Sequence, residues 1–367
     1  MTKLNQLEKL GQSVWLDYIG RKLLTSGDLI KLREMGVRGM TSNPTIFDKA
    51  ISKSSDYDED IRTLMLKGFS VEDILEKLTL KDIGIAADEM RKVYNETDGD
   101  DGYISIEVNP LLANNTEETI RQAKHLFKEL GRPNIMIKIP GTDAGMPAIT
   151  ETLASGINVN ITLIFSTDSY RKVVEAFMAG LEKYDAAGGD IRRHASVASF
   201  FVSRVDTAVD KELEAKGNKD LLGKIAVANS KIAFEISEEM FSSERWENLA
   251  AKGARKQKLL WASSSTKNPN YSDVLYIDEL IGNDTINTMT IDSINAFIDH
   301  GKVELTLNKG IGEAKSQLKK LKELGIDLNK ITDTLLNDGV KAFSHSFESL
   351  LESLKQKVKK FKAEVSV

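Results

Sequence analysis

Lys138 lies in the strand-like run 134–140, where an ammonium group interrupts an otherwise apolar pattern. Alternate residues of a strand point to opposite faces, so Ile135, Ile137 and Ile139 share one face and Lys138 lies on the other. A buried ammonium group is costly unless it is paired or loses its proton. A neutral lysine amine attacks carbonyl groups to form a Schiff base, so the run indicates carbonyl chemistry. The structural alternative is a gatekeeping or salt-bridged lysine on an edge strand.

Other strand-like runs also carry polar side chains at alternate positions. These polar positions are Asp17 in the first run, Ser105, Glu107 and Asn109 in the second, and Asn158, Asn160 and Thr162 in the third. Carboxylates beside a lysine suit general acid–base catalysis of carbonyl chemistry without a metal. In a closed parallel barrel, one strand face packs on helices and the other points into the interior near the site. The pattern therefore predicts one shared interior site, whereas antiparallel strands with a solvated face would be joined by short hairpins.

Eight strand candidates alternate with helical patterns along the chain. They lie near 13–17, 38–42, 103–108, 135–139, 157–164, 195–201, 258–263 and 286–289. Helical periodicity fills much of the space between them, for example over 115–130, 168–187 and 222–241. The alternation predicts an α/β fold, a (β/α)8 TIM barrel with additional helices, in a single domain over 1–367.

Two helical additions to the barrel are expected. The first is an insertion near 56–97, between the second and third strands, flanked by turn signals at 67–70 and 98–102. The second is a C-terminal extension near 312–364, in which apolar residues recur at near-helical spacing from Leu328 onward. This spacing predicts one or two long amphipathic helices that pack against the barrel or against a second subunit.

Composition narrows the class of protein. The 367 residues include 50 basic and 55 acidic side chains, a net charge of −5, so neither nucleic acid nor an anionic membrane is an expected partner. The absence of cysteine excludes disulfides and thiolate zinc sites. No signal-like segment or membrane-spanning run occurs, so we expect a cytoplasmic protein. The four histidines lack metal-ligand spacing and no nucleotide-binding loop occurs, so we expect neither metal nor cofactor.

Several motifs, in order, resemble those of the transaldolase family. The segment 41–47, Thr-Ser-Asn-Pro-Thr-Ile-Phe, resembles the signature around that family's active-site asparagine. The segment 137–140 resembles the strand that bears its Schiff-base lysine, 156–166 its third signature, and 198–206 its phosphate-side strand. The match extends from about residue 11 to about residue 350, and the longer loops and C-terminal helices resemble the longer bacterial type.

The resemblance implies a class I aldolase barrel and a role for each matched residue. Lys138 would attack the C2 carbonyl of a ketose, and Asp17 would take the proton of the C4 hydroxyl as the C3–C4 bond breaks. Glu107, with Thr162, would hold the water that carries protons during Schiff-base formation and hydrolysis. The remaining matches are substrate contacts: Asn43 and Asn160 for the dihydroxyacetone hydroxyls, Ser199 beside the substrate, and Arg204 for the sugar phosphate.

A second phosphate contact stays open at this stage. The segment 260–269 resembles the family's serine-containing strand end, where many members carry a basic residue two positions after the first serine. Here that position is Ser265, and the nearest cation is Lys267. Either Lys267 reaches the phosphate from a longer turn, or Ser263 and Ser265 supply hydrogen bonds while Arg204 carries the charge.

The expected activity is transfer of a dihydroxyacetone unit from sedoheptulose 7-phosphate or fructose 6-phosphate to glyceraldehyde 3-phosphate or erythrose 4-phosphate. The resemblance places this reaction in the non-oxidative pentose phosphate pathway. We also expect the protein to form a homodimer. The first alternative is a fructose-6-phosphate aldolase that releases free dihydroxyacetone. Such relatives usually have glutamine at the position of Glu107 and tyrosine at that of Phe201, a substrate-side residue here. The second alternative is a barrel that binds sugar phosphates without catalysis.

Overall fold

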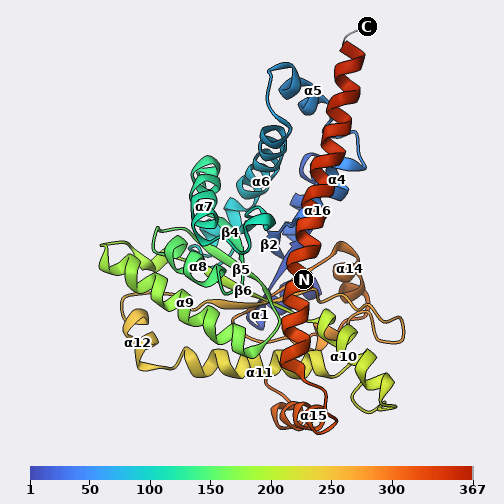
Figure 1. The fold of residues 1–367 in the computed structure, drawn as a ribbon. Coiled ribbons are helices and arrows are strands. Elements are labelled where there is room, and N and C mark those ends of the chain that lie inside the picture. Colours follow the sequence, from blue (N-terminus) through green and yellow to red (C-terminus); the bar gives the residue numbers. More distant parts are fainter. Residues whose placement is uncertain (366–367) are drawn as a thin grey trace.

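Eight parallel strands close into a barrel in the computed structural model, which describes residues 1–365 (Figure 1). Each strand pairs with the next along the chain, and β8 pairs with β1. The strands are β1 (Gln12–Asp17), β2 (Val37–Thr41), β3 (Ile104–Glu107), β4 (Ile135–Pro140), β5 (Val159–Ile164), β6 (Ser196–Phe201), β7 (Lys258–Ala262) and β8 (Thr285–Met289). All eight predicted strands and the (β/α)8 barrel are confirmed.

Helices connect the parallel strands, because a parallel connection has to cross over the sheet. α7 (Thr116–Leu130) illustrates how the sequence specifies one of them. Asn115 caps its first turn by accepting a hydrogen bond from the Glu118 amide at 3.1 Å, and Gly131 ends it in the left-handed conformation at φ 58°. Its buried residues recur at helical spacing and face the strands: Thr119, Ala123, Leu126 and Leu130.

The other helices differ in how they begin, and several of them have no side-chain cap. Before β5 these are α1 (Lys3–Lys9), α2 (Arg21–Thr25), α3 (Asp28–Met35), α4 (Pro44–Ser52), α5 (Asp58–Leu66), α6 (Val71–Glu96) and α8 (Gly145–Leu153), with the 3₁₀ turn η1 (Pro110–Leu112). After β5 they are α9 (Thr167–Ala186), α10 (Ser203–Ala215), α11 (Ile225–Met240), α12 (Glu244–Ala250), α13 (Leu275–Glu279), α14 (Ile291–His300), α15 (Ile311–Glu323) and α16 (Leu328–Val365), with η2 (Ile191–Arg193).

The predicted helical insertion consists of α5 and α6, which lie between β2 and β3 in the sequence. The turn before α6 contains Gly68 at φ 82°, and Ser70 then caps the helix by accepting from the Asp73 amide at 3.1 Å. The turn after it contains Asp98, Gly99 and Gly102 at positive φ. Both predicted turns are therefore present, and they fix the ends of the 26-residue helix α6.

The C-terminal extension consists of α15 and the 38-residue helix α16. α16 is the longest helix and runs past the barrel toward α5 (Figure 1). Along its length Ser346 bonds Thr45 of α4 at 2.8 Å, and Lys357 bonds Asp58 of α5 at 2.8 Å. At Gly339 the helix backbone lies so close to β5 that an added Cβ would meet the Leu163 side chain at 2.9 Å. Within the chain, α16 therefore packs against α4, α5 and β5.

The interior of the barrel is filled below the polar site. Trp15 of β1 is 1% exposed and donates its indole N–H to Asp101 at 2.8 Å, while Ser13 also hydrogen bonds to that carboxylate. Gly39 lies opposite Trp15 in the register, and a Cβ there would meet the indole at 2.5 Å. Ser13, Trp15 and Asp17 are alternate residues of β1, so their side chains lie on the same face of the strand. The packed Trp15 and the Asp17 carboxylate of the site therefore both point into the barrel. In residues 1–365 no helix combines the length and apolarity needed to cross a membrane.

Candidate active site

Strand register places an acid and an amide on either side of Lys138. Glu107 of β3 is the register partner of Lys138 on β4, and Lys138 is in turn the partner of Asn160 on β5. The Lys138 Nζ lies 3.6 Å from Glu107 Oε2 and donates a hydrogen bond to the Ser42 carbonyl at 3.0 Å. The residue is only 5% exposed. Lys138 is therefore a buried amine with one carboxylate and one carbonyl beside it.

The Glu107 carboxyl is poised to exchange a proton near neutral pH. Its side chain is 5% exposed, and Oε2 has no hydrogen-bond donor. Burial raises the pKa of Glu107 to about 7, against the opposing pull of the Lys138 charge and with a smaller push from the Asp17 charge. A group with a pKa near the working pH can both give and take a proton, which is what a general acid–base catalyst requires.

This shift predicts how Glu107 affects stability. A rise in pKa from 4.5 to about 7 means that the folded protein holds the proton more tightly than the unfolded chain, so folding weakens as the pH rises through that window. The shift corresponds to at most about 3 kcal/mol. As the pH rises from 5 to 8, the free energy of unfolding of the wild type should therefore fall by up to about 3 kcal/mol more than that of Glu107→Gln. Urea denaturation at several pH values measures this difference. Parallel pH dependences in the two proteins would contradict the shift.

Two threonines fix the Asp17 carboxylate at the end of β1. Thr41 of β2 donates its hydroxyl proton to Asp17 Oδ1 at 2.7 Å. The Thr41 and Thr288 hydroxyl oxygens are also 2.7 Å apart. Because Thr41 has one hydroxyl proton and gives it to Asp17, Thr288 has to be the donor in the second bond. The chain of bonds crosses the closure of the barrel, since β1 lies between β2 and β8.

The Asn160 amide is held by a serine on each side. Its Nδ2 donates to Ser105 Oγ at 2.9 Å, and its Oδ1 accepts from Ser199 Oγ at 2.7 Å. Two residues further along β5, the Thr162 hydroxyl is fully buried and has no hydrogen-bond partner in the structure. An unpaired buried hydroxyl costs free energy unless a ligand or a water satisfies it, so Thr162 points to a bound polar group.

Most of the predicted site residues line one cavity of about 520 Å³. Those that do are Asp17, Asn43, Lys138, Thr162, Ser199, Phe201, Arg204, Ser263, Ser265 and Lys267. Glu107 and Asn160 are not among the lining residues, but each contacts one that is: Glu107 lies beside Lys138, and Asn160 bonds Ser199. Asn43 also caps α4, because its Oδ1 accepts from the Ile46 amide at 3.0 Å.

Arg204 provides an unpaired cation on the wall of this cavity. Within residues 1–365 it makes no ion pair or hydrogen bond, and its guanidinium carbon lies 5.4 Å from the centre of the Phe201 ring. Burial lowers the pKa of Arg204. A buried guanidinium without a carboxylate favours an anionic ligand, and its planar donors suit a phosphate.

The segment that follows β7 places Ser263, Ser265 and Lys267 on the wall of this cavity. Ser263 adopts a positive φ of 55° and shares a hydrogen bond with Ser203 at 3.0 Å, while Ser265 bonds Ser293 at 2.8 Å. Lys267 is exposed, and in the described part of the chain it makes no ion pair. In both bonds either oxygen can be the donor, so each serine that accepts keeps its own hydroxyl proton for a phosphate, and the Lys267 ammonium also has unused donors.

Three side chains of the site were not predicted from the sequence. Thr41 and Thr288 hold Asp17, and Phe343 of α16 places its ring centre 6.0 Å from the Lys138 Nζ. Thr41 starts the motif 41–47, so its position at a strand end was a usable signal. Thr288 and Phe343 carried no comparable signal, because their roles depend on barrel closure and on the path of α16. Among residues 1–365 no cluster of three or more His, Cys, Asp or Glu side chains could hold a metal ion.

Comparison with known proteins agrees with this arrangement. The family described as Transaldolase/Fructose-6-phosphate aldolase matches residues 14–354. Transaldolase 2 of Nostoc sp. strain PCC 7120 is 46% identical over 371 residues, covering 97% of each chain. The transaldolases of Saccharopolyspora erythraea and Trichodesmium erythraeum are 46% and 45% identical, and each match covers 97% of this chain and 98% of theirs. The chain belongs to the transaldolase/fructose-6-phosphate aldolase family.

Proposed function

We propose that this protein is a transaldolase that moves a dihydroxyacetone unit from a ketose phosphate to an aldose phosphate through a Schiff base on Lys138. The observation that carries the proposal is a buried amine 3.6 Å from a carboxyl group whose pKa is raised to about 7. The same cavity contains the unpaired guanidinium of Arg204, which suits a sugar phosphate. The similar proteins named above are transaldolases, which supports transfer of the three-carbon unit over its release as free dihydroxyacetone.

The proposed chemistry begins with attack of the Lys138 amine on the ketose C2 carbonyl. Glu107 gives the proton that lets the carbinolamine lose water, and the product is an iminium ion. Asp17 then takes the proton of the C4 hydroxyl, the C3–C4 bond breaks, and its electron pair moves into the iminium to give an enamine. The aldose product leaves, and addition of the enamine to an acceptor aldehyde reverses these steps. Hydrolysis of the imine, with Glu107 now acting as base, releases the new ketose.

The polar side chains around Lys138 are proposed to hold the three-carbon unit during this exchange. Asn43 and Asn160 would bind its hydroxyls, with Ser199 beside the substrate, and Asn160 is already oriented by its bonds to two serines. The unpartnered Thr162 hydroxyl would bind the water that Glu107 uses, which gives that buried group the partner it lacks. A preoriented amide needs little rearrangement when the substrate binds.

Arg204 is proposed as the main phosphate ligand, with Lys267 as a second cation. Arg204→Ala should lower kcat/KM for fructose 6-phosphate by about 10- to 100-fold, because a hydrogen bond to a charged group contributes about 1.5–3 kcal/mol. The loss should appear mainly in KM. Unphosphorylated fructose is the matched control substrate, and its slow turnover should be the same in both proteins. An equal loss for both sugars would refute a phosphate role for Arg204.

Dependence on an acceptor separates transfer from simple cleavage. With fructose 6-phosphate alone, a transaldolase retains the dihydroxyacetone unit on Lys138, so release of glyceraldehyde 3-phosphate should stop after about one equivalent. Addition of erythrose 4-phosphate should restart turnover and produce sedoheptulose 7-phosphate. Steady release of free dihydroxyacetone without an acceptor would instead identify an aldolase.

We further propose a cytoplasmic location, a single domain and a homodimeric assembly. The sugar-phosphate substrates proposed above support the cytoplasmic location. Size-exclusion chromatography with light scattering would measure the assembly, and a mass near 40.7 kDa would refute the dimer.

A further inference from the structure

Phe343 brings an apolar ring from α16 to the Lys138 amine. The residue is 5% exposed, and the centre of its ring lies 6.0 Å from Lys138 Nζ. Both residues line the proposed sugar-phosphate cavity. The other neighbours of the amine are the Ser42 carbonyl and the Glu107 carboxyl, which are polar and come from the barrel. The amine therefore has polar partners on the barrel side and an apolar neighbour from α16.

The helix α16 lies across the mouth of the barrel at which the site is found. In a parallel barrel the C-terminal ends of all strands meet at one mouth. α16 contacts α4 and η1, which follow β2 and β3, and it also contacts β5 and α10, which follows β6. A helix that touches the segments after several strands passes over that mouth, so its side chains can cover the site from the solvent side.

Two contacts fix the position of Phe343 along α16. Glycine is unfavourable inside a helix, so a glycine there usually has a packing reason. Gly339 lies four residues before Phe343, and an added Cβ would meet the Leu163 side chain of β5 at 2.9 Å. Three residues after Phe343, Ser346 hydrogen bonds to Thr45 of α4 at 2.8 Å. The ring is therefore held between a close helix–strand approach and a hydrogen bond.

The phosphate end of the cavity offers a separate route from solvent. Lys267 on the cavity wall is exposed. Arg204 and Lys267 also line a neighbouring cavity of about 860 Å³, which Lys138 and Phe343 do not line. An aldose phosphate can therefore reach these cations while the ring stays over the amine.

We propose that Phe343 decides between transfer and release of the three-carbon unit, because its ring covers the enamine on Lys138 and keeps bulk water from it until an acceptor aldehyde arrives. This inference rests on the Schiff base proposed above. A carbon bonded to Nζ on the side of the ring would lie within about 5 Å of the ring centre, close to van der Waals contact, so no layer of water fits between them. Exclusion of water protects reactive intermediates from side reactions.

The step that the ring blocks is protonation of the enamine. Premature release begins when C3 of the enamine takes a proton from water, which gives the iminium ion of dihydroxyacetone. Water then adds to C2, the C2–N bond breaks, and one proton returns to solvent, so the net reaction consumes one water and frees the lysine. Productive hydrolysis of the new ketose needs only the water proposed at Glu107 and Thr162, on the barrel side of the amine. The ring therefore slows loss of the three-carbon unit without removing the water of the normal cycle.

Phe343→Ala should divert turnover from transfer to release. With fructose 6-phosphate alone, release of dihydroxyacetone per active site should rise at least about tenfold above wild type, because bulk water then reaches the enamine. Formation of sedoheptulose 7-phosphate from added erythrose 4-phosphate should change by less, and borohydride trapping counts the active sites. Phe343→Val also uncovers the enamine and replaces the alanine variant if that one fails to fold. A wild-type ratio of release to transfer in the folded variant would overturn the proposal.

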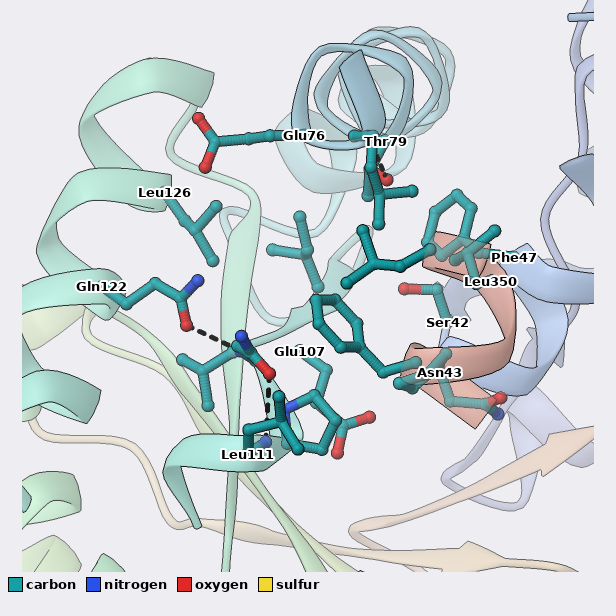
Figure 2. A pocket seen from close by; sticks show the side chains of 18 of the residues that line it. Ser42, Asn43, Phe47, Glu76, Thr79, Glu107, Leu111, Gln122, Leu126 and Leu350 are labelled. Atoms are coloured by element: carbon teal, nitrogen blue, oxygen red, sulfur yellow. Dashed lines mark hydrogen bonds between the residues drawn. The ribbon is translucent and has the colours of Figure 1, made fainter. Parts of the chain in front are cut away.

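Phe347→Ala is the matched control, because it removes the same ring from the next turn of α16. Phe347 lines a separate cavity of about 390 Å³ instead of the sugar-phosphate cavity. Figure 2 shows this separate cavity, with Leu350 of α16 and Phe47 of α4 on the same side of it. The control should keep the wild-type ratio of release to transfer. An equal rise in both alanine variants would mean that loosening of α16 admits water, and the assignment to Phe343 would be wrong.

Deuterium exchange measures water access to the enamine directly. In D2O each protonation places a deuteron on C3, and reversal of that step followed by aldol addition leaves deuterium at C3 of the recovered ketose. With fructose 6-phosphate and glyceraldehyde 3-phosphate at equilibrium, Phe343→Ala should incorporate deuterium at C3 at least about tenfold faster than wild type, measured by NMR. Equal rates of incorporation would refute exclusion of water by the ring.

Borohydride trapping separates failure of this inference from failure of the proposed function. If wild type gave no adduct on Lys138, the Schiff base and the role of Phe343 would both be wrong. If wild type and Phe343→Ala gave the same adduct and the same rate of release, the Schiff base would stand and only the role of Phe343 would be refuted.

Discussion

Replacement of Lys138 by methionine should abolish transfer of the three-carbon unit, with a loss of kcat of at least about 10⁴-fold, the scale seen when a covalent nucleophile is removed. Methionine keeps the apolar stem that packs near Phe343 but has no amine, so the change isolates the chemistry from the packing. The steady-state rate of sedoheptulose 7-phosphate formation, followed with a coupled assay, gives the comparison. A residual rate within tenfold of wild type would contradict the Schiff-base account.

Lys231 offers a matched control for this substitution. It is 7% exposed, compared with 5% for Lys138, and it likewise contacts one backbone carbonyl and one carboxylate, those of Lys309 and Glu279. Lys231→Met should therefore cost stability, because it leaves these partners without a buried cation. It should keep nearly normal turnover per folded molecule. A similar collapse of activity in both variants would mean that burial of any lysine, rather than Lys138 chemistry, limits the rate.

Glu107→Gln should lower kcat by about 10²- to 10³-fold, because a positioned general acid–base group contributes roughly 10²–10⁴-fold. The loss should appear in formation and hydrolysis of the imine, since glutamine cannot exchange a proton near neutral pH. Wild type should also show an inflection in kcat/KM near pH 7, the value to which burial raises the Glu107 pKa, and the variant should lack it. Rapid-quench trapping across this pH range measures both effects.

Glu279→Gln is the corresponding control, because Glu279 pairs with Lys231 at 3.3 Å outside the site. The Glu279→Gln variant should retain the wild-type kcat and the inflection of kcat/KM near pH 7. If Glu107→Gln kept the inflection, another group would have to be the titrating acid.

The barrel and most of its site were predictable because two simple rules operate together. Alternation along a strand puts Glu107, Lys138 and Asn160 on an interior face, and parallel pairing brings neighbouring strands into register. The motifs 41–47 and 156–166 then singled out individual amides and hydroxyls. Local sequence also specified helix ends, as with the capping residue Asn115 and the terminating Gly131 of α7.

The features that were not predicted depend on contacts between distant segments. Thr288 bonds Thr41 only because β8 closes the barrel against β1. Phe343 reaches the lysine because α16 crosses the mouth at one particular helical register, which periodicity alone does not give.

Trapping the intermediate tests the central claim most directly. The protein is incubated with fructose 6-phosphate, reduced with borohydride, digested and mapped by mass spectrometry. We predict one stable adduct with the mass of a reduced dihydroxyacetone unit, on the peptide that contains Lys138. No adduct, or an adduct on another lysine with Lys138 unmodified, would contradict the account.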